Sequence, residues 1–112
     1  MFERARRYYL YNRPVDMRKS FNTLCAVVRQ QMRMELQEHA GYIFINKRAT
    51  HMKVLFWEGD GLSIYYKRLE QGTFEHQDQG PEYRISHEQL MLILRGISTQ
   101  KIIRRKRYKL GR

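Results

Sequence analysis

The 112-residue sequence has little of what marks secreted, membrane-spanning or metal-binding proteins. Its single cysteine, Cys25, excludes an internal disulfide and a thiolate zinc site, and it fits a reducing compartment. No apolar run approaches the ~20 residues that a transmembrane helix needs. The segment from Met1 to Arg13 also lacks the apolar centre of a signal peptide. We therefore expect a cytoplasmic protein without a membrane partner.

Acidic residues are also scarce. The chain has 11 of them against 22 lysines and arginines, so its formal net charge is +11. Such an excess favours polyanionic partners, because it steers their approach and releases counterions from nucleic acid. The length is typical of one domain. We expect a single domain over residues 1–100, followed by a basic tail over residues 101–112.

Catalytic patterns are missing. There is no glycine-rich phosphate loop, and the four histidines have no spacing typical of a metal site. Glu58 and Asp60 could hold a divalent metal for phosphoryl chemistry, although Asp and Gly are also what a tight turn prefers. Cys25 lies on an apolar helix face, which favours a packed core residue over a nucleophile. We predict no enzyme, no metal and no cofactor, with a metal-dependent nuclease as a minor alternative.

The first half of the chain predicts a strand and a helix. The aromatic cluster Tyr8–Tyr11 is typical of a short strand. Asp16 is a plausible N-cap for a helix beginning near Met17. Gly41 is expected to end a helical segment or to form a turn. One helical face carries an apolar stripe of Phe21, Leu24, Cys25, Val28 and Met32.

A hairpin dominates the middle. Strands over His51–Trp57 and Leu62–Leu69 flank a Glu58–Gly61 turn, since glycine takes the positive φ that tight turns require. A two- or four-residue loop places Trp57 opposite Leu62, whereas a three-residue loop places it opposite Ser63. The sequence leaves this register open. Further strands are predicted at Tyr42–Asn46, Thr73–Glu75 and Tyr83–Ile85.

A second helix follows a capping box in which Ser86 is the N-cap and Gln89 is the third helical residue. Leu90, Ile93, Leu94 and Ile97 lie on one of its faces. We therefore predict an α+β fold, with a small antiparallel sheet around a central hairpin and two amphipathic helices packed on one face.

The candidate nucleic-acid contacts are cations at three places. Lys67 and Arg68 follow Tyr65 and Tyr66 in the hairpin, where they either contact phosphates or simply end an exposed strand. Two cations at the start of the first helix, an unfavourable place for positive charge, either bind something or are tolerated. The tail is either a nucleic-acid contact or a solvated terminus. The predicted set is Arg18, Lys19, Lys67, Arg68, Arg104, Arg105, Lys106 and Arg107.

Two segments carry a family resemblance: RPVDMRKSFNTL, from Arg13 to Leu24, and VLFWEGDGLSIYYKRLEQGTF, from Val54 to Phe74. In these segments the chain resembles the small TnpB-type accessory protein, also called Orf2-like, of the insertion-sequence sixty-six family of bacterial transposable elements. The similarity covers roughly residues 7–98, including SHEQLMLILRG from Ser86 to Gly96. The resemblance implies an accessory role beside a separate, larger transposase that cuts the strands, and it supplies no catalytic residues.

The leading hypothesis is a non-catalytic accessory protein that binds DNA and helps the transposase assemble on element ends. Its partners would be DNA and the element-encoded transposase, and its place the bacterial cytoplasm, on the nucleoid when DNA-bound. The alternative is a protein–protein adaptor that docks on the transposase through exposed aromatic residues, without a direct DNA role. The sequence leaves oligomeric state and DNA sequence preference open.

Overall fold

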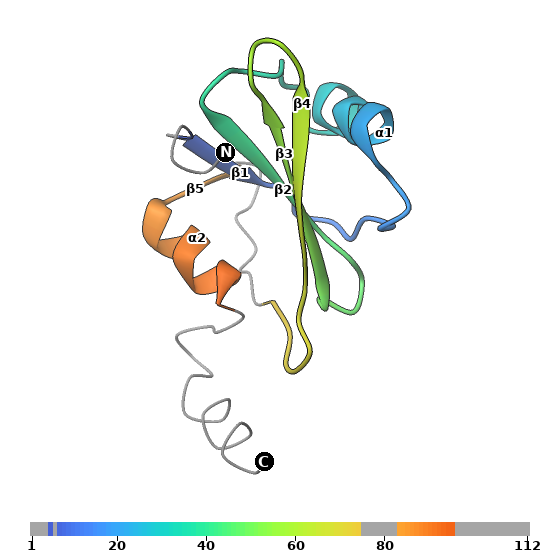
Figure 1. Cartoon of the computed structure of the whole chain (residues 1–112), viewed down its shortest axis with the longest axis vertical. Coiled ribbons are helices and arrows are strands. Elements are labelled where there is room, and N and C mark those ends of the chain that lie inside the picture. The colour runs from blue at the N-terminus through green and yellow to red at the C-terminus, as the bar shows by residue number, and fades with distance from the viewer. Residues whose placement is uncertain (1–4, 6, 75–82, 96–112) are drawn as a thin grey trace.

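The computed structural model describes residues 5, 7–74 and 83–95. In this part of the chain, five strands form one sheet in the spatial order β4-β3-β2-β1-β5 (Figure 1). The strands are β1 (Arg7–Leu10), β2 (Ala40–Ile45), β3 (His51–Trp57), β4 (Leu62–Arg68) and β5 (Arg84–Ile85). The helices are α1 (Phe21–Ala26), which continues as the π-helical segment η2 (Val27–Gln31), and α2 (His87–Leu94).

The sheet is mixed rather than antiparallel. β1 pairs with β2 in parallel, while the β1–β5, β2–β3 and β3–β4 pairs are antiparallel. The prediction of an antiparallel sheet was therefore wrong for one pair. The reason is the connection between β1 and β2, which runs through α1 and η2. A crossover of this length is what a parallel pair requires, whereas a short turn would force an antiparallel one.

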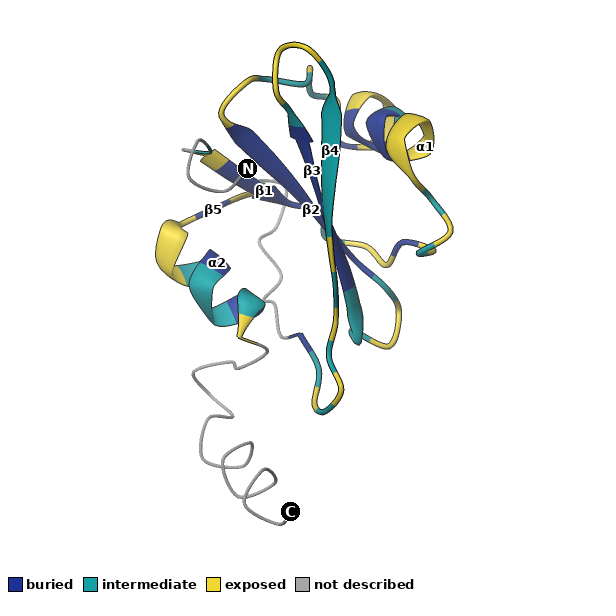
Figure 2. Ribbon diagram, viewed as in Figure 1, coloured by how far each residue is buried: buried dark blue, intermediate teal, exposed yellow. Residues whose placement is uncertain are grey.

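The predicted hairpin forms, but it lies at an edge of the sheet and not at its centre. Trp57 pairs with Leu62 and the Glu58 N–H donates to the Gly61 carbonyl at 2.9 Å, so the strands are joined by the four residues 58–61. This is one of the two registers left open by the sequence. β2 is the central strand and all six of its residues are buried, whereas no residue of the edge strand β4 is fully buried (Figure 2).

The two helices cover opposite faces of the sheet, so the prediction of one shared face was wrong. Leu24 and Val28 of the first helical segment pack with alternate strand residues such as Tyr42 and Leu55. Leu90 of α2 packs on the other side with residues such as Ile43. β2 and β3 are apolar at successive positions, which is typical of strands buried on both faces, and each face therefore needs its own cover.

The first helix begins later than Asp16 predicts. α1 starts at Phe21 with Ser20 as N-cap, and the Ser20 N–H donates to the Thr23 Oγ1 at 2.7 Å. Arg18 and Lys19 therefore lie in the preceding loop and not in the helix. The Asp16 carboxylate accepts hydrogen bonds from Arg18 instead of capping a helix. Of the predicted apolar stripe, Leu24, Cys25, Val28 and Met32 are buried, while Phe21 is exposed.

The second helix begins as predicted. The Gln89 N–H donates to the Ser86 Oγ at 3.1 Å, and the Ser86 N–H donates to the Gln89 Oε1 at 2.8 Å. Gly41, in contrast, is not a stop or turn but a residue of β2. A Cβ there would lie 3.0 Å from the Phe56 Cε1 and 3.1 Å from the Tyr8 Cδ1, so the close packing of neighbouring rings explains the glycine.

Several predictions fall wholly or partly outside the described residues: the end of the strand at Thr73–Glu75, Ile97, the boundary at residue 100 and the basic tail. Thr73 and Phe74 are not in a strand, but the Phe74 N–H donates to the Ala49 carbonyl at 2.6 Å and its ring is buried. Among the helices that the structure describes, none has the length and apolar character needed to cross a membrane.

Candidate nucleic-acid interface

Cations from three separate segments gather at one end of the sheet. The β2–β3 turn carries Lys47 and Arg48, and Arg68 pairs with His51 where β4 ends beside this turn. The loop before α1 lies beside them, because its carbonyls accept hydrogen bonds from Lys53 of β3. We call this surface the basic end of the sheet, and its cations are Arg18, Lys19, Lys47, Arg48, Lys53, Lys67 and Arg68. Among the described residues, the acids of this surface are Asp16 and Glu70 against seven cations, so positive charge dominates there.

At the basic end, Lys53 joins β3 to the loop before α1. Its side chain reaches from β3 to the loop before α1, where the ammonium donates to the carbonyls of Met17 at 2.8 Å and Lys19 at 2.7 Å. The ammonium also lies 4.8 Å from the centre of the Tyr66 ring, a cation–π distance. Lys53 is 8 % exposed, so its charge is fixed beneath this surface rather than at it.

Arg18 is held by Asp16. Its guanidinium Nε and Nη2 donate to the two carboxylate oxygens, with a shortest distance of 2.6 Å, and the side chain is 92 % exposed. The hydrogen bonds from Arg18 lower the pKa of Asp16 to about 2, so the carboxylate keeps its charge at a lower pH than an isolated aspartate does. An exposed pair of this kind contributes little to stability and can exchange its carboxylate for a phosphate.

The two hairpin cations have different environments. The Lys67 ammonium donates to the Leu94 carbonyl at 2.6 Å, where it satisfies the last turn of α2 and complements the helix dipole. Arg68 is exposed, and its Nη2 lies 2.8 Å from the Glu70 Oε1. Lys67 therefore has a structural role, whereas Arg68 remains available to an incoming anion that can displace Glu70.

The neighbouring aromatic residues divide in the same way. Tyr65 is partly buried and packs against the core on the α2 side of the sheet. Tyr66 points to the other face and is 53 % exposed. The first ring of this strand end therefore contributes to the core, whereas the second lies at the surface. Contact of this strand end with phosphates stays a prediction.

His51 completes the basic end, and its Nδ1 is the ring nitrogen that contacts Asn46 and Thr50. The Asn46 Oδ1 accepts from the N–H groups of Thr50 and His51, which leaves the Asn46 amide nitrogen as the donor toward the His51 Nδ1 at 3.3 Å. The Thr50 hydroxyl lies 2.8 Å from the same Nδ1. In the neutral ring the proton is therefore on Nε2, which is a donor.

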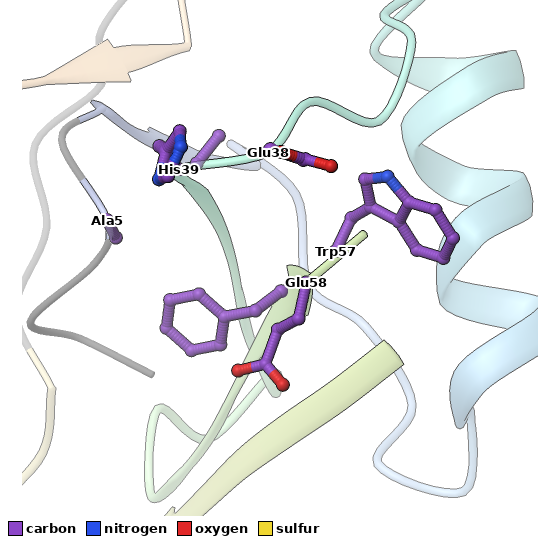
Figure 3. Close-up of a pocket in the computed structure, with 7 residues that line it drawn as sticks. Ala5, Glu38, His39, Trp57 and Glu58 are labelled. Atoms are coloured by element: carbon purple, nitrogen blue, oxygen red, sulfur yellow. The ribbon is translucent and has the colours of Figure 1, made fainter. Parts of the chain in front are cut away.

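The other predicted site elements lie elsewhere. Arg104, Arg105, Lys106 and Arg107 fall outside the described residues. Glu58 lies at the opposite end of the sheet, beside a cavity of about 60 Å³ that Glu38, His39 and Trp57 also line (Figure 3). Figure 3 shows the carboxylates of Glu38 and Glu58 pointing in different directions. In the described part of the chain, no three metal-ligating side chains come together.

Cys25 is buried beside Leu24 and Val28 in the core on the α1 side, and burial raises the pKa of its thiol. A thiol of this kind is poorly ionised. Cys25 is therefore a packing residue of the core, as predicted.

Four residues of the basic end were not among the predicted contacts: Lys47, Arg48, His51 and Lys53. The turn cations could have been found by asking which charged loops join adjacent strands. Lys53 could have been found as the charged member of the otherwise apolar strand run Met52–Trp57. Its partners at Met17 and Lys19 lie more than 30 residues away, so no local pattern predicts them.

Residues 6–104 match the family model described as IS66 Orf2 like protein. The chain is 25 % identical over 103 residues to the uncharacterized protein y4jC of Sinorhizobium fredii, covering 91 % of this chain and 88 % of that one. It is 29 % identical over 83 residues to the uncharacterized protein y4hO of the same strain, covering 73 % and 72 % respectively. No solved structure matches the chain.

Proposed function

Because the chain belongs to the family of IS66 Orf2-like proteins, we propose that it is a non-catalytic accessory protein of transposition that binds DNA. In this role it helps the separate, element-encoded transposase assemble on the ends of the element, in the bacterial cytoplasm. The family assignment supports the link to an insertion sequence. The DNA contact rests on the arrangement of charge on the folded chain.

The observation that carries the proposal is the concentration of cations at the basic end of the sheet. Arg18 and Lys19, Lys47 and Arg48, and Arg68 come from three segments separated by tens of residues, yet they surround one end of one sheet. Phosphate contacts of this kind provide affinity and position a protein on DNA without reading its sequence. Arg18 and Arg68 are each held by an exposed carboxylate, an arrangement that suits exchange with phosphate.

The test is a mobility shift on end-derived and scrambled duplexes across a series of salt concentrations. The double variant Lys47→Gln/Arg48→Gln should bind more weakly, and each lost phosphate contact should reduce the salt slope by about 0.9. Arg84→Gln is the matched control, because Arg84 is an exposed cation on β5, at the opposite edge of the sheet. If wild-type protein binds neither duplex at low salt, the proposal is wrong.

A second candidate is a protein–protein adaptor that docks on the transposase. The observation in its favour is that Phe21 and Tyr66, the exposed large hydrophobic residues of the described chain, both lie on the α1 side. Exposed aromatic residues are frequent binding hot spots. Co-purification with the transposase that survives nuclease treatment and deletion of residues 101–112 would favour this candidate, and its loss on nuclease treatment would favour DNA.

A further inference from the structure

A hollow of about 340 Å³ lies at the basic end, lined by His51, Tyr66, Arg68 and Glu70. We propose that this hollow binds one unpaired nucleotide, with its base stacked on Tyr66 and its phosphate on Arg68 and His51. The inference rests on the proposed DNA-binding function and deepens it, because it names single-stranded DNA as the ligand of this hollow.

The Tyr66 ring is built as a stacking surface. Its inner side lies over the Lys53 ammonium, 4.8 Å from the ring centre, and more than half of the residue is exposed. Lys53 is itself fixed by the carbonyls of Met17 and Lys19, so the ring has a rigid support. Exposed aromatic rings beside fixed positive charge are what proteins use to bind unpaired bases, since every base has a π-face.

His51 adds a hydrogen-bond donor to the hollow. Its Nδ1 accepts from the Asn46 amide, so the neutral ring carries its proton on Nε2. The ring centres of His51 and Tyr66 are 6.0 Å apart with a 44° tilt, and both residues line the hollow. A nucleotide on Tyr66 would thus have a hydrogen-bond donor for its phosphate within the same hollow.

Arg68 supplies the charge, and Glu70 is its partner in the structure. Both members of this ion pair are well exposed, so the pair is weak. A phosphate oxygen is a stronger partner for the planar guanidinium, and a phosphate group can accept two of its hydrogen bonds. Binding of a phosphate therefore displaces Glu70 from Arg68.

An unpaired nucleotide fits this hollow better than a duplex. Bases within a duplex are stacked on one another, so their π-faces are not available to Tyr66. An unpaired base exposes its π-face without the free-energy cost of unstacking a duplex.

The experiment measures fluorescence anisotropy with three labelled probes of equal length: a single-stranded oligonucleotide, an abasic strand with the same phosphates, and a duplex. We expect the base-containing strand to bind roughly 5- to 150-fold more tightly than the abasic one, which is the range for one stacked base. Tyr66→Ala should abolish this difference, whereas Tyr66→Phe should retain it. Phe21→Ala is the control, because Phe21 is exposed but does not line the hollow.

A second measurement needs no variant. Adding a mononucleotide to the wild-type protein should shift the amide NMR signals of His51 and Tyr66 more than the same concentration of inorganic phosphate. Duplex binding without any preference for bases, together with equal NMR shifts, would overturn the nucleotide hollow and leave the proposed DNA function standing. A lack of binding to all three probes at low salt would overturn both.

Discussion

At the scale of single residues, the formal charge of this chain is not the charge that its surface offers. Arg18 and Arg68 each face a carboxylate, and Lys67 faces the last turn of α2. The carboxylate partners lie two positions away in the sequence, so a local pattern can predict them. The partner of Lys67, Leu94, lies 27 positions away. Its structural role is invisible until the hairpin and α2 are placed side by side.

Gly59 is a residue whose substitution should be costly. Its φ is +88°, a region that residues with a Cβ rarely adopt, and a Cβ would lie 2.7 Å from the Glu38 Oε1. We expect Gly59→Ala to lower the free energy of unfolding by about 1–3 kcal/mol, the usual cost of a strained backbone. Chemical denaturation monitored by circular dichroism measures this.

Gly61→Ala is the matched control in the same turn. A Cβ added at Gly61 would meet no atom within 4 Å, and the φ of this residue is not in the positive range. This variant should therefore be neutral or gain up to about 1 kcal/mol, since alanine restricts the unfolded chain. Equal losses for the two variants would contradict the argument from turn geometry.

At the scale of elements, the sequence predicts what local chemistry controls. The strand over His51–Trp57 and the cap of α2 at Ser86 were predicted to the residue. The start of α1 was not predicted. Asp16 has the chemistry of an N-cap, but its carboxylate accepts from Arg18 in a loop whose carbonyls at Met17 and Lys19 accept from the distant Lys53. The separation of the helices onto two faces depends on which side of β2 and β3 each covers, and a mean apolar content does not reveal that.

The cap of α2 gives a prediction at this scale. Ser86→Ala removes the acceptor for the Gln89 N–H, and N-cap serines typically contribute about 1 kcal/mol. We expect a loss of that size in urea denaturation. Ser86→Asp retains an acceptor and adds a charge that suits the helix N-terminus, so it should unfold like the wild type. If Ser86→Asp loses as much as Ser86→Ala, the cap does not stabilise α2.

At the scale of the whole molecule, Lys53 joins the two segments that carry the family resemblance. The first, Arg13–Leu24, provides the carbonyls of Met17 and Lys19, and the second provides Tyr66. One side chain from β3 thus connects a loop, a strand and the face of a ring. The basic end of the sheet depends on this connection, because the hydrogen bonds of Lys53 attach the loop containing Arg18 to β3.

Lys53→Met tests the connection. Methionine matches the length and apolar part of the lysine side chain but leaves two part-buried carbonyls without their donor, and an unsatisfied acceptor away from water costs about 1–3 kcal/mol. We expect the free energy of unfolding to fall by about 2 kcal/mol, with faster hydrogen exchange over residues 17–20. Lys47→Met, at an exposed turn, is the control and should change neither measurement. If both variants behave alike, the loop is held by other contacts, and the support proposed for Tyr66 falls with it.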